Sequence, residues 1–237
     1  MSQAALERHR AYFGQLAGWC PDPFKGLTRA VLWTFDQLLE LVAGDPDGVD
    51  EAARRSARAG ERVHHAADEH RANVARLRPH WHGHAGDAFQ SATRQFGASV
   101  DGLGDGFDEL AAVLVEASRA STEAFDGLGD LVVEFLDWYV PEVTAAAATA
   151  GDPSGTGEVR FAARVFERLA ETLRRMWRLV DGYTATLERL TVRLSTRLGI
   201  PAPTTGTARP VPLDAPPEDV TGPYRAAVQD LILGAAA

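Results

Sequence analysis

The sequence predicts an all-α protein: an elongated antiparallel helical hairpin, with additional N- and C-terminal helices packed against it as a bundle. Two observations support this fold class. Small and apolar residues recur at alternating spacings of four and three in several long segments, which places them on one face of a helix that meets a neighbour. The 237 residues are also 45% hydrophobic, and a good share of that content is alanine, which suits close-packed helices.

The first 47 residues are predicted to form helices that pack on the bundle. The first helix runs from Gln3 to Trp19 and ends before a Cys-Pro-Asp-Pro tetrapeptide. Within it, Asp22 is the expected N-cap and Pro23 the expected first turn of a second helix. The apolar stripe of this second helix consists of Leu27, Val31, Phe35, Leu38 and Val42.

Residues 48–140 are predicted to form the hairpin, after a turn at 44–48. Its arms span about 48–78 and 84–140, and each carries one line of residues that should meet the other arm. The line on the first arm is Val49, Ala53, Ser56, Gly60, Val63, Ala67, His70, Val74 and Leu77. The line on the second arm is Phe89, Ala92, Phe96, Ser99, Leu103, Gly106, Leu110, Val113 and Ala117.

The segment between the arms has the residues that a chain reversal needs. Pro79 ends the first helix because it lacks an N–H and restricts the residue before it, and Gly83 can adopt a positive φ. Trp81 is expected to be buried over the end of the seam, where Phe89 receives its indole. Two small residues keep the entry to the second arm narrow, and these are Ala85 and Ala88.

The run from Trp81 to Phe89, read as Trp-x-Gly-x-Ala-x-x-Ala-Phe between two heptad arms, resembles the WXG family of type VII secretion substrates and related helical domains of actinobacteria. Gly44-Asp45-Pro46, at the start of the first arm, is also similar to larger members of that ESX-like family. The resemblance covers roughly residues 24–140. It implies a helical hairpin that pairs with another helical chain, and export without a cleaved leader.

The resemblance also implies a Tyr-x-x-x-Asp/Glu export element after the hairpin. Tyr224 is followed by Val228 at that spacing, and the acid comes only at Asp230. Tyr224 and Asp230 are therefore a candidate secretion tail that departs from the family pattern. Seven of the thirteen prolines fall between Pro201 and Pro223, so residues 200–237 are expected to form an extended linker and a short tail.

A long helix is predicted at 158–198, after a break at 141–157 in which the alanine run could stay helical. Residues 158–198 hold nine arginines and five acids, a net charge of +4, whereas residues 84–142 hold two arginines and twelve acids, a net of −10. We therefore expect the basic helix to lie along the acidic arm. Its apolar stripe supplies the stability, consisting of Ala162, Phe166, Leu169, Leu173, Met176, Val180, Tyr183, Leu187, Leu190 and Leu194.

Composition argues against several classes of function. A net charge of −9 disfavours a nucleic-acid or anionic-membrane partner, and the apolar stretches are too short or too amphipathic to span a bilayer. Met1 to Arg10 has no leader-like apolar core. Cys20 is the only cysteine, so it is expected to be a packed small residue. No catalytic set can be assembled, and no cofactor is expected.

Two motifs have a functional and a structural interpretation. Six of the seven histidines lie at 64–84, where a metal or pH-sensing site is the alternative to a solvated arm and turn. Their positions are His64, His65, His70, His80, His82 and His84. The Asp-Gly-rich stretches 101–106 and 126–130 lack the strand and spacing of a phosphate or calcium loop, so their glycines are expected to admit a neighbouring helix closely.

Three hypotheses follow. The first is a non-enzymatic helical interaction protein of type VII secretion, which pairs with a WXG-like partner or with itself and contacts the secretion machinery. The second is a toxin-delivery or adaptor domain without its effector module. The third is a metal-dependent sensor or enzyme built on the histidine cluster.

Overall fold

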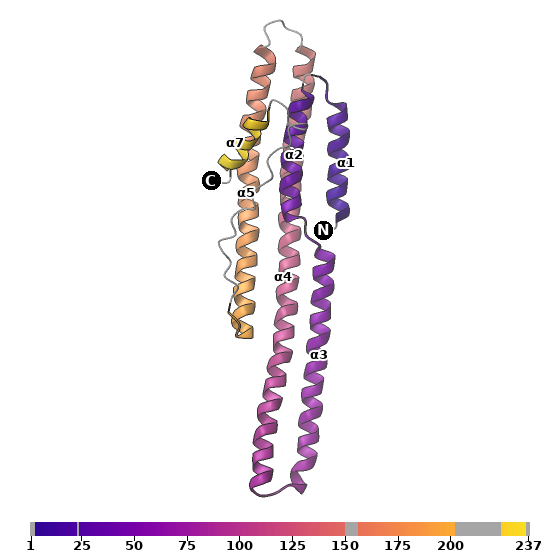
Figure 1. Cartoon of the computed structure of the whole chain (residues 1–237). Coiled ribbons are helices and arrows are strands. Elements are labelled where there is room, and N and C mark those ends of the chain that lie inside the picture. The colour runs from indigo at the N-terminus through magenta and orange to yellow at the C-terminus, as the bar shows by residue number, and fades with distance from the viewer. Residues whose placement is uncertain (1–2, 23, 150–155, 202–223, 236–237) are drawn as a thin grey trace. The chain divides into compact units, whose positions relative to one another are not determined.

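The computed structural model describes residues 3–22, 24–149, 156–201 and 224–235, and these contain helices and no strand. In chain order (Figure 1) the helices are α1 (Gln3–Trp19), α2 (Lys25–Val42), α3 (Pro46–Leu77), a 3-10 turn (Arg78–His80), α4 (His84–Thr149), α5 (Thr156–Leu198) and α7 (Arg225–Ala235). The predicted all-α class is confirmed. Within these described segments, no helix combines the length and the apolar character needed to cross a bilayer.

The chain divides into two compact units. The core unit comprises Met1–Pro46, Ala120–Thr186 and Thr205–Ala237, and the hairpin unit comprises Asp47–Arg119 and Leu187–Thr204. The division of the chain into the five stretches predicted from the sequence stays a prediction.

The core unit is built on large side chains. The predicted stripe of α2 is buried from Leu27 to Val42, and it packs on the C-terminal part of α4 and the N-terminal part of α5. Edge-to-face aromatic pairs join these elements, with ring centroids 5.1 Å apart between Phe35 and Phe135 and 4.9 Å between Phe24 and Phe161. Such pairs add to the stability that burial of apolar area supplies.

The predicted start of α2 is wrong. The N-cap is Phe24, which makes no side-chain cap hydrogen bond, whereas Asp22 forms an ion pair with Lys25 at 3.4 Å. Phe24 is buried and its ring meets Phe161. Packing of this ring, rather than a capping carboxylate, fixes where the helix begins. Pro23 lies outside the described residues.

Two proline positions differ from the expectation that they interrupt helices. Pro46 is the first residue of α3, where the missing N–H would have no partner in the helix anyway. Pro141 lies inside α4, which continues to Thr149. Pro141 is exposed, while its neighbours Tyr139 and Val143 are buried in the core. Tertiary packing on both sides of Pro141 therefore holds the helix through it, and the alanine run stays helical.

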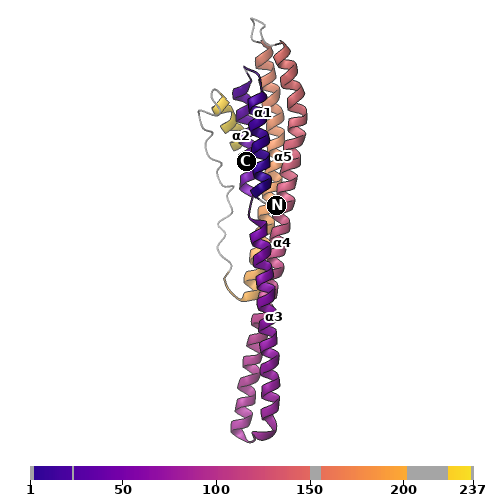
Figure 2. The ribbon, with the colours of Figure 1, turned by 90° about the vertical axis from the view of Figure 1, so that its right-hand side faces the viewer.

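In the hairpin unit, α3 lies beside the N-terminal part of α4, and the chain reverses between them at residues 78–83 (Figures 1 and 2). The C-terminal part of α5 packs on the N-terminal half of α4. A Cβ placed on Gly106 would lie only 3.1 Å from Leu198. This unit is joined by small residues rather than by large ones.

Ion pairs between α5 and α4 confirm that the basic helix lies along the acidic arm. In the core unit, Arg164 pairs with Glu142 at 3.0 Å, and Arg168 and Arg175 pair with Glu134 at 3.0 and 2.7 Å. In the hairpin unit Arg193 pairs with Glu116 and Arg197 with Asp105, both at 2.9 Å. These pairs lie at the surface, where solvent screens them, so each contributes little to stability. Buried α5 residues such as Leu169, Leu173 and Met176 contribute more.

Candidate functional site: the hairpin turn and its flanks

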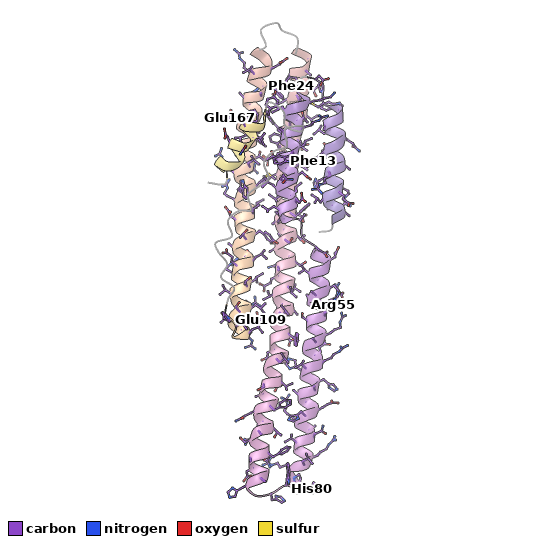
Figure 3. All side chains as sticks on the ribbon, in the orientation of Figure 1. Phe13, Phe24, Arg55, His80, Glu109 and Glu167 are labelled. Atoms are coloured by element: carbon purple, nitrogen blue, oxygen red, sulfur yellow. The ribbon has the colours of Figure 1, made fainter. Side chains whose placement is uncertain are left out.

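The turn between α3 and α4 has the backbone geometry that its residues predict. Pro79 lies in the 3-10 segment that ends α3, Trp81 is extended with φ −128° and ψ 107°, and Gly83 has φ +80°. The N–H of Asp87 donates to the carbonyl of Gly83 at 3.0 Å, which closes the first turn of α4. In Figure 3 the labelled His80 marks this turn at the end of the two arms.

Trp81 is not buried, contrary to the sequence-based prediction. Its ring meets that of Phe89 edge-to-face, with centroids 4.5 Å apart, but 48% of the residue stays exposed. In the described parts of the chain, the turn offers one aromatic partner and no third helix covers the end of the seam, so about half of the indole faces solvent. Ala85 and Ala88 are exposed as well.

Gly86, which sequence analysis did not single out, is the small residue that the turn requires. A Cβ placed on it would lie 2.7 Å from the carbonyl oxygen of Trp81. A backbone carbonyl cannot move aside easily, so a side chain at position 86 would displace the extended backbone of the turn at Trp81. The available signal was a glycine in the first turn of a helix, a position that a glycine otherwise weakens.

The seam between the arms agrees with the predicted line on α3 but only in part with the line on α4. Ala53, Gly60 and Ala67 are buried as predicted. On α4, Gly106 and Val113 of the predicted line are buried, but nearer the turn the buried residues are Gly86, Gly97 and Gly104, whereas Phe96 and Leu103 are exposed. The arms approach through glycine, and Phe96 lies at the edge of the seam, where its ring meets that of His70 edge-to-face with centroids 5.0 Å apart.

Phe96 and Leu103 are 57% and 55% exposed, and they lie seven residues apart on one face of α4. The smaller Ala92 and Ser99 lie between and beside them and are exposed too. Ser99 is seven residues before Gly106, the residue that Leu198 of α5 touches. The α4 face that α5 covers near Gly106 therefore continues toward the turn without a covering helix in the described parts of the chain. We call Ala92, Phe96, Ser99 and Leu103 the open flank.

His64 is the one histidine that the hairpin holds against several charges. Its ring lies over Gly104, where a Cβ would be 2.6 Å from the imidazole. Its Nε2 is 3.1 Å from Asp108, and ring nitrogens are 3.9 Å from Asp101 and Asp105. Arg71 also binds Asp101 and donates to Asp68 at 2.6 Å. The hydrogen bonds to Asp68 and then to Asp101 raise the pKa of Arg71. These contacts align the arms of the hairpin.

The other histidines of the 64–84 cluster lie along α3, in the turn and at the first residue of α4. His80, His82 and His84 are exposed, and His65 lies 3.5 Å from Glu69. Over the described ranges, no three histidine, cysteine or acidic side chains come together in a group that could hold a metal ion.

The glycine-rich stretches of α4 do admit neighbouring side chains closely, as predicted. Cβ atoms placed on Gly104 and Gly106 would meet His64 and Leu198. In the core unit, one placed on Gly127 would lie 3.1 Å from Leu179 of α5.

The candidate secretion tail lies on the core unit. Tyr224 is partly buried, with its ring centroid 5.9 Å from that of Phe166, and a Cβ placed on Gly26 would be 3.5 Å from it. Val228 is fully buried beside Ala30, and Asp230 is exposed. The predicted proline-rich linker falls almost wholly at 202–223, outside the described residues.

Comparison with known proteins agrees with the hairpin resemblance. Residues 42–124, about a third of the chain, match the model of the WXG100 family, described as proteins of 100 residues with WXG. The match supports a WXG-family protein over this segment, which contains α3, the turn and the start of α4. That family is associated with type VII secretion and with helical protein–protein interaction. Searches of curated proteins and of solved structures found no match.

Proposed function

We propose that this chain is a non-enzymatic helical interaction protein of type VII secretion. It acts by pairing its hairpin with another helical chain, which is a WXG-like partner or a second copy. The family match at 42–124 supports the secretion role. The single observation that carries the pairing role is the open flank, where Phe96 and Leu103 expose more than half of their surface beside small residues.

The open flank has the composition of a helix-packing surface. Large side chains at seven-residue spacing alternate with Ala92 and Ser99, so a partner helix can seat its own side chains between them, as knobs in holes. The charges along α4 change near this point. Residues 85–100 carry one aspartate and one arginine, whereas residues 105–142 carry ten acids and one arginine. The part of the open flank near the turn therefore carries no net charge, and packing there does not require a basic partner helix.

In the cell, this function places the chain either among the exported substrates or with a partner that is exported. The ESX-like and actinobacterial setting, contact with the secretion machinery and the leaderless route belong to the same proposal. Tyr224 and Asp230 are the candidate recognition residues for export, and Trp81, whose indole is half exposed, is a second candidate determinant for recognition by the machinery.

Co-expression with candidate small helical partners tests the pairing. We expect pull-down of one partner, or a dimer by light scattering, and loss of the complex in the double variant Phe96→Asp/Leu103→Asp. Val115→Asp is the matched control, because Val115 is 55% exposed on the same helix but lies outside the open flank. A protein that stays monomeric alone and with every candidate, or a complex that survives the double variant, contradicts the proposal.

Export is measured on the same strains. Appearance of the chain or its complex in the culture medium, dependent on an intact type VII system, is the expected result. Retention of both chains inside the cell under secreting conditions contradicts the secretion role while leaving the pairing intact.

A further inference from the structure

A groove of about 510 Å³ runs between α3 and α4 near the turn. Its apolar lining comes from Val74 and Ala75 on α3 and from Gly97 and Ala98 on α4. Gly97 is buried, and the side chains around it are small, so the two helices leave a concave surface. None of these residues belongs to the open flank.

Three arginines line the groove: Arg71 from α3, Arg78 from the 3-10 turn that follows it, and Arg94 from α4. Arg71 is occupied by Asp68 and Asp101. Arg78 and Arg94 have no carboxylate partner among the described residues, and the Nε of Arg94 donates to the carbonyl of Gln90 at 3.1 Å. One unneutralised guanidinium therefore stands on each arm.

The charge of this region is opposite to that of the chain. The lining of the groove holds three arginines and one aspartate, Asp101, a net of +2, in a protein with a net charge of −9. Surface arginines that lack a carboxylate partner and border an apolar groove form charge-assisted, often bidentate hydrogen bonds to carboxylates. A basic partner or a neutral apolar one does not use them.

His70 gives a second, independent sign that the groove is incomplete. It lines the groove, and its Nε2 is buried without a hydrogen-bond partner among the described residues. A buried nitrogen of this kind is unfavourable until a partner reaches it. A ligand that seats polar groups against the α3 wall would supply one.

We propose that this groove binds an acidic, amphipathic segment of a partner protein. The apolar side of the segment lies on Val74, Ala75 and Ala98, and its carboxylates bind Arg78 and Arg94. The groove adjoins the open flank, because the ring of Phe96 packs edge-to-face on that of His70 with centroids 5.0 Å apart, but the two surfaces share no residue. This proposal therefore goes beyond the helix pairing described above and can fail without it.

A pair of synthetic peptides tests the proposal on the full chain. Both are helical peptides of about four turns, roughly 14 residues, with alanine and leucine on one face. One carries glutamate beside that face, and the other carries lysine at the same positions. We expect the glutamate peptide to bind about tenfold more tightly in fluorescence anisotropy, as two exposed charge pairs allow, and added salt to reduce the difference.

Charge reversal identifies the groove as the site. Arg78→Glu/Arg94→Glu should weaken the glutamate peptide about tenfold and reverse the preference toward the lysine peptide. Arg62→Glu/Arg76→Glu is the matched control, since both arginines are exposed on α3, neither lines the groove, and the net charge changes equally. Arg78→Gln/Arg94→Gln, which introduces no new charge, should lose the preference and keep the melting temperature.

Several outcomes overturn the proposal. Equal affinity for both peptides removes the role of charge, and equal loss in the control double variant assigns the effect to net charge. The glutamate peptide binds on the open flank if Phe96→Asp/Leu103→Asp abolishes its binding and Arg78→Glu/Arg94→Glu does not. That last result rejects the groove and supports the helix-pairing function.

Discussion

Gly104 and Gly102 lie two residues apart on α4 and give opposite expectations for substitution by alanine. A Cβ on Gly104 would lie 2.6–2.8 Å from atoms of the His64 ring, whereas a Cβ on Gly102 meets nothing within 4 Å. Gly104→Ala should destabilise the protein by at most about 1 kcal/mol, because the partly exposed His64 ring must move away from Asp108 to admit the new Cβ. Gly102→Ala should stabilise it by about 0.5–1 kcal/mol, because alanine favours the helix. Urea unfolding followed by circular dichroism compares the two, and equal effects would refute the close seam.

Tyr139 makes the stability of the core depend on pH in the alkaline range. Burial raises the pKa of its hydroxyl well above the usual range, and the hydroxyl is 2.7 Å from that of Thr28. Because the folded-state pKa is the higher one, the unfolded state loses its proton first, above the unfolded tyrosine pKa of about 10. The stabilising contribution is present below that pH and is lost as the pH rises through and beyond it.

Tyr139→Phe tests this expectation. The variant should lose about 1 kcal/mol near neutral pH with the Thr28 hydrogen bond, and its free energy of unfolding should fall less steeply above about pH 10. Tyr12→Phe, which changes an exposed tyrosine, should retain the parent slope. Parallel slopes for the parent and the Tyr139 variant would show that the buried hydroxyl does not govern alkaline stability.

Among the elements, α4 holds a proline in its interior. Pro141 removes one helical hydrogen bond and its ring crowds the carbonyl of the preceding turn, which is unfavourable by up to about 3 kcal/mol relative to alanine. Because Pro141 is exposed, Pro141→Ala should raise the melting temperature without disturbing the core around Tyr139 and Val143. A lower melting temperature would mean that the backbone geometry imposed by proline is needed for packing at this point.

The elements also show what sequence periodicity can and cannot specify. The bounds of α1 agree with the prediction, because a proline-containing tetrapeptide follows it. α5 begins two residues earlier than predicted and ends as predicted, because its apolar stripe is continuous. The predicted line on the second arm was wrong at Phe96 and Leu103. Both residues keep the heptad spacing, but spacing alone does not say which neighbour a helix face meets. The glycines at 97 and 104 allow the arms to approach more closely than phenylalanine and leucine would.

The candidate site was predictable only in part for the same reason. The turn and the positive φ of Gly83 follow from local backbone chemistry, which the sequence specifies directly. The exposure of Trp81 depends on whether a third element covers the turn, and that is a property of the tertiary structure. The arginine groove joins residues from two helices, so no local motif could indicate it.

At the scale of the whole molecule, buried apolar side chains are distributed unevenly. The large cluster of buried residues belongs to the core unit. Within the described hairpin unit the buried hydrophobic residues are Ala53, Ala67, Val113 and Leu190. Since resistance to local opening follows buried apolar contact, the hairpin should open more readily than the core.

Native-state hydrogen exchange measures this difference. Amides near Ala67 should exchange faster than those near Leu128 and Leu169, which are fully buried. A helical partner that covers the open flank should slow exchange in the hairpin unit and leave the core amides unchanged. Uniform protection along α3 and α4 in the free protein would contradict the expected difference.

Cys20 gives the protein a built-in chemical reporter. Its side chain is buried, 1% exposed, its Sγ lies 2.9 Å from the hydroxyl of Thr28, and burial raises the pKa of the thiol. Thiolate is the reactive form, so maleimides and disulfide reagents should not react with Cys20 while the core unit is folded. Cysteines introduced on the hairpin surface can then carry fluorophores without removal of the natural thiol. The slow modification of Cys20 itself times the opening of the core.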